Sequence, residues 1–387
     1  MQPSFNLGTL GSVSSGKSTC IYSLTGILTQ RTSSEKVRNM TIKPGYANIM
    51  IYGDDNNYSI DSKDNLPLKK YISFIDCPGH YELTKVVLGQ VNMMSGAICI
   101  ISAVEDIMNN KQLREHLNAA KLAGIKKIIV CLNKCDLLEK KEIINKKNKV
   151  DELFKIMGLK YLCIIPTSFT HNIGVDYLLK AIDMLFETPK YNNTTKPQFY
   201  ISRSFDINRP GTNFMDLKGG VVGGSLIKGT LSVGDMVEIK PGIVGKVNGK
   251  IVSMPIKSKI LSIKSEKKEL KNITPGGLMA IRLDIDSQFT KNDRMIGNMM
   301  GLVNHLPEVY NNIKIKYKLF DKVLLEKNDT VNLQIGTLNL VGTITRINKL
   351  FINLDLERPC CLEKKTTIFI NKITDKTLNI IGKGYLC

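Results

Sequence analysis

The octapeptide GSVSSGKS at residues 11–18 constrains this chain more than any other segment. It fits the pattern of a glycine, four variable residues, and Gly-Lys-Ser. Residues 5–10 before it predict a short apolar strand, and residues 19–28 after it place apolar side chains on one helical face. A glycine loop between a strand and a helix binds phosphate in this context. The alternative, a Gly/Ser-rich surface turn, does not explain the further nucleotide-site motifs downstream.

The loop supplies several candidate binding groups. Its backbone N–H groups and the helix N-terminus are expected to point at a β-phosphate. The Lys17 ammonium would neutralise phosphate charge, and the Ser18 hydroxyl is placed to bind Mg²⁺. The candidate nucleotide-binding residues here are Ser14, Ser15, Gly16, Lys17, Ser18 and Thr19.

A second motif, DCPG at residues 76–79, ends the predicted strand 71–76. Asp76 is expected to hold Mg²⁺ through water, and the Gly79 N–H to approach a γ-phosphate. Thr41 precedes this strand, and its hydroxyl can bind Mg²⁺ only when the γ-phosphate is present, which makes its segment an ordering switch. His80 follows Gly79, where a water-positioning side chain belongs, although a lone histidine beside Pro-Gly is more often a surface residue.

A third motif, NKCD at residues 133–136, also follows a predicted strand and is expected to read a base. The Asp136 carboxylate can accept two N–H bonds from guanine, whereas adenine lacks that donor pattern. Asn133 and Lys134 belong to the same motif; taken alone, these four residues could be a helix-capping turn. Ser168 and Phe169 follow the next strand and are expected to close over the base. The ligands expected are therefore GTP or GDP with Mg²⁺.

Composition limits the class of protein. The 387 residues carry 54 Lys+Arg against 35 Asp+Glu, a formal charge of +19, which favours a polyanionic partner such as nucleic acid. An A/T-rich genome is the alternative source of these lysines. No apolar run is long enough to span a bilayer, and the first strand begins near residue 5, so we expect no membrane association and an intracellular, cytoplasmic location. The nine cysteines form no Cys-x-x-Cys pair, so no zinc is expected.

The order of predicted elements indicates three domains. Residues 1–190 alternate strands with helices, as in an α/β domain whose parallel-type sheet has helices on both faces. A polar linker at 187–198 precedes short β-branched runs punctuated by glycine, which predict a β-barrel over 197–304. A second β region covers 305–387, with the boundary near His305. Residues 53–70 are polar and predict a loop.

With these motifs, the chain resembles a translational GTPase, and in particular the gamma subunit of eukaryotic and archaeal translation initiation factor 2. The resemblance extends from Phe5 to about Gly384. The discriminating segments are MTIKPGYAN at 40–48, SRSFDINRPGT at 202–212, DLKGGVVGGSLIKG at 216–229 and LPEVY at 306–310.

The resemblance implies a P-loop GTPase domain followed by two β-barrels. It implies GTP hydrolysis to GDP with His80 as the catalytic residue, and carriage of methionyl initiator tRNA to the small ribosomal subunit. Tyr46 falls where the family's tyrosine lines the pocket for the methionyl end. Alpha and beta subunits, a GTPase-activating factor and a nucleotide-exchange factor are the implied protein partners.

The chain also departs from the family's pattern. Serines stand at positions 12, 14 and 15, where the family has histidines and often an aspartate that can bind a second Mg²⁺. Asn39 replaces the switch glycine, and Phe169 replaces the alanine beside the base. The cysteine-bearing zinc knuckle is reduced to the cysteine-free loop 53–70, and the C-terminal barrel has Asn371-Lys372 in place of an arginine pair.

Two alternatives stay open from the sequence alone. One is an elongation-factor-type GTPase that carries another aminoacyl-tRNA, which tRNA selectivity would distinguish. The other is a GTP-binding scaffold that no longer hydrolyses GTP. The presence of Lys17, Thr41, Asp76 and His80 argues against the scaffold.

Overall fold

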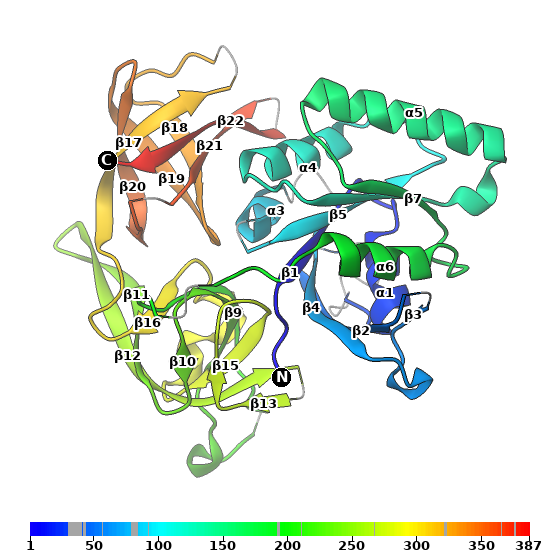
Figure 1. Cartoon of the computed structure of the whole chain (residues 1–387). Coiled ribbons are helices and arrows are strands. Elements are labelled where there is room, and N and C mark those ends of the chain that lie inside the picture. The colour runs from blue at the N-terminus through cyan, green and yellow to red at the C-terminus, as the bar shows by residue number, and fades with distance from the viewer. Residues whose placement is uncertain are drawn as a thin grey trace. The chain divides into compact units, whose positions relative to one another are not determined.

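The computed structural model describes most of the chain, in two compact units. One unit is Pro3–Pro189, and the other is Lys190–Cys387 with Met1–Gln2 (Figure 1). The described residues are 1–29, 41, 44–55, 57–78, 84–91, 93–191, 194–209, 211–266, 268–320, 323–364, 366–374 and 377–387.

The first unit is built on a seven-stranded sheet in the order β3-β2-β4-β1-β5-β6-β7. Strands β4, β1, β5, β6 and β7 are parallel, whereas β2 pairs antiparallel with β4 and β3 antiparallel with β2. The bounds are β1 Asn6–Leu10, β2 Gly45–Gly53, β3 Tyr58–Ser59, β4 Leu68–Asp76, β5 Gly96–Ser102, β6 Ile128–Asn133 and β7 Cys163–Thr167.

Five helices of the described residues cover this sheet on both faces. Helices α1 and α6 lie on one face, and α3, α4 and α5 lie on the other (Figure 1). Their bounds are α1 Lys17–Thr25, α3 Thr84–Val91, α4 Lys111–Leu122, α5 Lys140–Met157 and α6 Val175–Leu185. Strand β5 is buried along its whole length, as a strand covered on both faces should be. The predicted α/β class is therefore confirmed.

The structure corrects the sequence prediction around residues 45–70. Residues 45–53 form strand β2, which was not among the predicted strands. The segment 53–70, predicted as a loop, contains the short strand β3 and the first residues of β4. Both belong to the antiparallel edge of the sheet, where one strand follows another without an intervening helix. The βα alternation used for the prediction does not apply there.

The second unit contains two antiparallel barrels, as predicted. In the first, strands β11-β16-β8-β9-β15-β12 close through the pairing of β11 with β12, and β13 adds to β12. The bounds are β8 Gln198–Phe205, β9 Val221–Lys228, β10 Leu231–Ser232, β11 Met236–Val247, β12 Lys250–Ser265, β13 Lys268–Leu270, β14 Asn272–Ile273, β15 Met279–Leu283 and β16 Met299–Leu302. Aliphatic side chains from these strands fill the interior.

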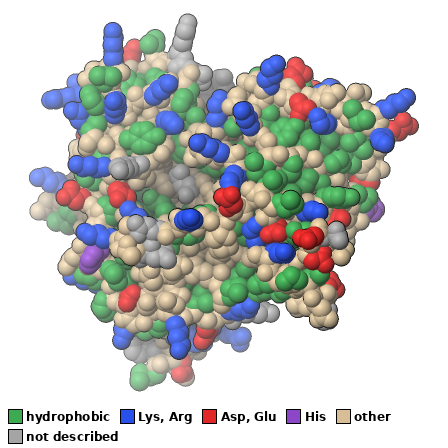
Figure 2. Space-filling view, in the orientation of Figure 1, with side chains coloured by type: hydrophobic (Ala, Val, Ile, Leu, Met, Phe, Trp, Pro, Cys, Tyr) green, Lys and Arg blue, Asp and Glu red, His purple; other side chains and the backbone are tan. Residues whose placement is uncertain are grey.

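The second barrel closes in the order β17-β20-β19-β18-β21-β22. Its strands are β17 Val309–Leu319, β18 Thr330–Ile335, β19 Leu338–Ile347, β20 Phe351–Cys361, β21 Ile368–Thr374 and β22 Thr377–Leu386. Inward residues alternate with outward ones, so that Ile313 and Ile315 of β17 are buried while Lys314 and Lys316 are exposed. Lysine and arginine side chains occur over much of the face shown in Figure 2, in keeping with the net charge.

Candidate nucleotide-binding site

The loop between β1 and α1 has the backbone conformation that its glycines predict. Gly11 and Gly16 have φ of 141° and 103°, and Ser14 has φ of 59°. A Cβ on Gly16 would lie 2.2 Å from Nδ2 of Asn133, so a side chain at this position would displace the base-motif asparagine. The Asn133 amide donates to the Ser15 carbonyl at 2.9 Å and ties the phosphate motif to the base motif.

The Lys17 side chain is buried inside this loop. Its ammonium donates to the carbonyls of Gly11 at 3.0 Å and Ser12 at 2.5 Å. Burial lowers the pKa of Lys17 to about 8, although the charge of Asp76 opposes that shift. A buried ammonium held only by neutral carbonyls lacks a full counter-charge, and a phosphate in the loop would supply one. The loop therefore fits the phosphate role predicted for it.

Asp76 is fully buried at the end of β4, and three hydroxyl groups meet its Oδ2 atom. Ser18 donates at 2.7 Å, Thr29 at 2.5 Å and Thr41 at 3.3 Å, while Thr9 donates to Oδ1 at 3.3 Å. Burial raises the pKa of Asp76, and the hydrogen bonds from Thr29 and Ser18 are the largest opposing effects.

This set of oxygen atoms fits Mg²⁺. A carboxylate with hydroxyl oxygens is the donor chemistry of a hard cation that keeps several waters and takes its remaining ligands from phosphate. Such a site needs only one carboxylate. Among the described residues, no group of three or more His, Cys, Asp or Glu is placed to hold a metal ion. The structure brings together Ser18, Thr41 and Asp76, the three predicted Mg²⁺ residues.

The base motif, residues 133–136, forms the part of the candidate site that would contact the base. Lys134 takes a left-handed conformation with φ of 65°, and Asp136 lies in the 3-10 turn Cys135–Leu137 that follows. A hydrogen bond from the Ser168 side chain lowers the pKa of Asp136, and the carboxylate stays partly exposed. Nε2 of His171 lies 3.7 Å from Oδ2 of Asp136, a contact that the sequence did not predict. An ionised, accessible carboxylate is what paired N–H donors require.

Phe169 departs from the family's alanine and is accommodated by the core. Its side chain is 3% exposed and packs in the hydrophobic cluster of the first unit. Its backbone N–H donates to Oδ1 of Asn133 at 3.2 Å. Among the other departures, Ser12 donates to Oε2 of Glu105 at 3.0 Å, and Ser14 is exposed.

Helix α4 holds the first half of the phosphate loop, which sequence reasoning missed. The Gly11 N–H donates to Nδ1 of His116 at 3.1 Å, and the Val13 N–H donates to Oε1 of Gln112 at 3.0 Å. Burial and the Lys17 charge lower the pKa of His116 to about 3, so the ring is neutral and Nδ1 accepts. These contacts span about a hundred residues, and nothing local in the sequence marks them.

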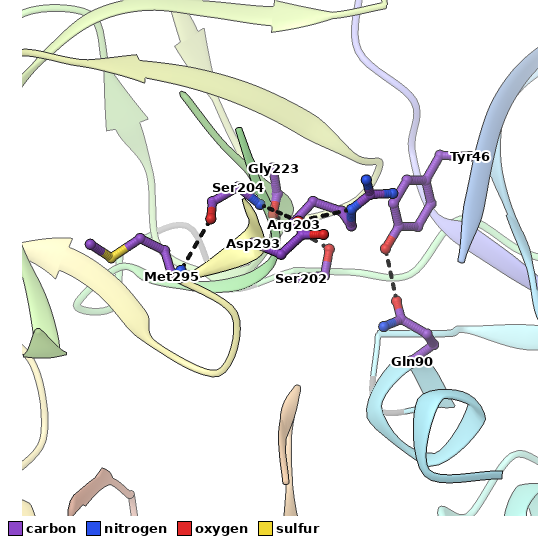
Figure 3. A network of polar contacts seen from close by, with 8 residues as sticks. All are labelled: Tyr46, Gln90, Ser202, Arg203, Ser204, Gly223, Asp293 and Met295. Carbon is purple, nitrogen blue, oxygen red and sulfur yellow. Dashed lines mark hydrogen bonds and ion pairs between the residues drawn. The ribbon is translucent and has the colours of Figure 1, made fainter. Parts of the chain in front are cut away.

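The remaining predicted residues divide into two groups. Gly79 and His80 lie outside the described residues, as do Asn39 and most of the switch segment around Thr41. Tyr46 is the second residue of strand β2, and its hydroxyl donates to Oε1 of Gln90 at 3.0 Å (Figure 3). Thr19 is exposed on the first turn of α1.

The second unit contributes a cavity of about 900 Å³ at one end of its first barrel. Two of the segments that suggested the family help to line it, through Asp206 and Lys218. Asp293 lies in the chain between the lining residues Asn292 and Arg294; it has φ of 62° and accepts from Nε of Arg203 at 3.1 Å and from the Ser204 N–H at 2.9 Å (Figure 3). The charged lining residues are Asp206, Lys218, Asp284, Asp286, Lys291 and Arg294.

Comparison with known proteins agrees with this geometry. Residues 2–188 match the family described as the elongation factor Tu GTP binding domain, and residues 311–386 match initiation factor eIF2 gamma, C terminal. The eukaryotic translation initiation factor 2 subunit gamma of Encephalitozoon cuniculi is 34% identical, over 99% of this chain and 92% of its own length. The chain belongs to the gamma-subunit family of translation initiation factor 2.

Archaeal relatives give the same result. Translation initiation factor 2 subunit gamma of Methanococcus maripaludis is 34% identical, over all of this chain and 98% of its own length. Among solved structures, a bacterial selenocysteine-specific elongation factor superposes with a TM-score of 0.76 at 23% identity. It matches all of this chain, which spans 58% of that factor's length. At that identity the likeness shows the fold alone.

The family assignment has two direct consequences. Membership of a translational GTPase family implies that the first unit is a guanine-nucleotide domain, as the motifs predict. It also separates the chain from the elongation factors that were an open alternative. No helix among the described residues is long and apolar enough to cross a membrane.

Proposed function

We propose that this chain is the GTP-switched subunit that carries methionyl initiator tRNA to the small ribosomal subunit and hydrolyses GTP when the start site is selected. The observation that carries the proposal is the assembly of three motifs in one unit. The phosphate loop, Asp76 with Thr41, and Asp136 with Ser168 are linked through Lys17 and Asn133.

The residues divide the work as follows. The loop's N–H groups, from Ser14 to Thr19, and the Lys17 ammonium bind the phosphates, and Asp136 accepts the two N–H groups of guanine. Ser18, Thr41 and water bound to Asp76 would hold Mg²⁺, which neutralises phosphate charge when bound. Gly79 would approach the γ-phosphate through its N–H.

Hydrolysis and its control are assigned to residues near that phosphate. His80 would orient the attacking water, a role realised mainly in the transition state. Thr41 would bind Mg²⁺ only when the γ-phosphate is present. Its hydroxyl is suitably placed, because it lies 3.0 Å from that of Ser18 at the proposed ion site. An ordered Thr41 segment is the difference between the two nucleotide states that the tRNA could sense.

Binding of the tRNA is assigned to two features. Tyr46 would read the methionyl end, and the basic surface would give a salt-dependent affinity for phosphates. The cavity of the second unit, with its mixed charges, suits a polar group such as a terminal nucleotide. We assign domain bounds of 1–190, 197–304 and 305–387. The proposed partners are alpha and beta subunits, a GTPase-activating factor and a nucleotide-exchange factor, all in the cytoplasm.

The experiment compares wild-type protein with Tyr46→Ala and Tyr46→Phe. Binding of charged and uncharged initiator tRNA is titrated with a non-hydrolysable GTP analogue at several salt concentrations. Tyr46→Ala should remove most of the preference for charged tRNA and leave the salt slope nearly intact. Tyr46→Phe keeps the ring but loses the bond to Gln90, and so separates ring contact from hydroxyl positioning. An unchanged preference in Tyr46→Ala would contradict the assignment of Tyr46.

A further inference from the structure

Thr29 makes the shortest side-chain hydrogen bond that Asp76 accepts from the described residues. It follows helix α1, outside every nucleotide motif found in the sequence, and its Oγ1 lies 2.5 Å from Oδ2 of Asp76. Both side chains are buried, Thr29 to 4% exposure and Asp76 to 0%. The bond therefore lies out of bulk water, where a charged hydrogen bond is stronger than at the surface.

The position of Thr29 is fixed by a third residue. A Cβ added to Gly45 would lie 2.5 Å from Cβ of Thr29 and 3.1 Å from its carbonyl oxygen. Gly45 is the register partner of Asp76 in the pairing of β2 with β4. The absence of a side chain at Gly45 thus leaves room for Thr29 beside the end of β4. Packing and hydrogen bonding hold the threonine in the same place.

We propose that Thr29 is a positioning residue of the Mg²⁺ site, whose hydroxyl holds the Asp76 carboxylate in the orientation that faces an ion-bound water. This rests on the nucleotide function proposed above. Ser18 and Thr41 also donate to Asp76, but both are proposed ligands of the ion, so their positions depend on it. Thr29 has no such second role and can hold Asp76 whether or not the ion is bound.

The bond from Thr29 is also shorter than the others that reach the same oxygen. Thr29 donates to Oδ2 of Asp76 at 2.5 Å, whereas Ser18 donates at 2.7 Å and Thr41 at 3.3 Å. Loss of the Thr29 hydroxyl would leave a buried carboxylate with one donor fewer, and its orientation would then depend more on the two proposed ligands of the ion.

A plain structural role is the competing explanation, and dependence on Mg²⁺ separates the two. The test uses Thr29→Val, which keeps the shape but removes the hydroxyl, and Thr29→Ser, which keeps the hydroxyl. Thr25→Ala is the matched control, because the Thr25 hydroxyl donates to the Ile21 carbonyl within α1. Dissociation of a fluorescent GDP is measured against free Mg²⁺ concentration and in excess chelator.

In Thr29→Val, the Mg²⁺ concentration for half-maximal retention of GDP should rise about tenfold, the low end of losses seen when a supporting hydrogen bond is removed. Dissociation in chelator should match wild type. Thr29→Ser and Thr25→Ala should both titrate like wild type. Should Thr29→Val fail to fold, Thr29→Ala removes the same hydroxyl with less bulk and takes its place.

Two results would overturn the assignment of Thr29. One is an unchanged Mg²⁺ midpoint in Thr29→Val, and the other is faster GDP release by the same factor with and without Mg²⁺. Failure of the proposed function would look different. Wild-type protein would then bind no GDP at any Mg²⁺ concentration, and the Thr29 proposal would fall with it.

Discussion

Replacement of Asp136 by asparagine tests the guanine assignment most sharply. The change removes the negative charge and one acceptor oxygen and leaves the shape of the side chain. In the structure this carboxylate accepts a hydrogen bond from the Ser168 hydroxyl, which asparagine can also accept, and it is 23% exposed; the other nearby group, Nε2 of His171, lies 3.7 Å away. The fold should therefore tolerate the change, and the cost should fall on the ligand.

The magnitude follows from the bonds lost. A hydrogen bond to a charged group contributes roughly 1.5–3 kcal/mol, and partial exposure reduces that, so a loss of about 1–3 kcal/mol is expected. That corresponds to a GDP affinity lower by about 5-fold to 150-fold. Xanthine carries an oxygen where guanine has its amino group, and the asparagine amide can donate to it. The preference should therefore shift towards xanthosine diphosphate.

The assay is calorimetric titration of GDP, xanthosine diphosphate and ADP with wild type, Asp136→Asn and Asp151→Asn. Asp151 is a matched control, because its carboxylate pairs with Lys147 on helix α5 and belongs to no nucleotide motif. Wild type should reject ADP. Unchanged GDP affinity in Asp136→Asn, or an equal loss in Asp151→Asn, would refute the assignment of the base site.

Three further expectations concern hydrolysis, charge and metal. His80→Ala should lower single-turnover GTP hydrolysis and leave GTP affinity unchanged; equal losses of both would indicate a structural role. Because burial lowers the pKa of Lys17 to about 8, the unfolded chain binds more protons than the nucleotide-free protein between pH 8 and 10.5. Lys17 therefore costs about 3 kcal/mol below pH 8, and that cost fades as pH rises. Denaturant unfolding should show Lys17→Met more stable than wild type at pH 7.5, with the gap falling to roughly 1 kcal/mol by pH 10; a gap independent of pH would refute this. After chelation and dialysis, elemental analysis should find no zinc, and one zinc per chain would contradict the expectation from cysteine spacing.

The parts of the fold that the sequence predicted carry a strong local signal. Helix α5 begins where its lysine-rich run does, with Glu139 and Glu142 forming a capping box, and it ends at Gly158 in a left-handed conformation. Strand β5 is an apolar run without charge, a pattern that predicts a strand buried on both faces. Strand β2 was not predicted because Tyr46, Met50 and Tyr52, at its less buried positions, are apolar or aromatic like the buried ones, so the sequence does not alternate although the burial does.

The candidate site also contains some residues that the sequence predicted and others that it did not. Lys17, Asp76 and Asp136 were predictable because each lies in a short motif at the end of a strand, and parallel strands bring those ends to one edge of the sheet. Thr29 and His116 were not, because each contacts the site through tertiary packing from outside any motif. The sequence gives such residues no local signal.

The central claim is that the γ-phosphate controls tRNA binding. A set of four binding titrations tests this claim most directly. Affinity of the wild-type protein is measured for charged and for uncharged initiator tRNA, each with GDP and with a non-hydrolysable GTP analogue, at fixed salt and Mg²⁺. The coupling free energy between nucleotide and tRNA follows from the four constants. We predict tighter binding with the analogue, mainly for the charged tRNA. Equal affinity with both nucleotides, and no effect of charging, would contradict the account.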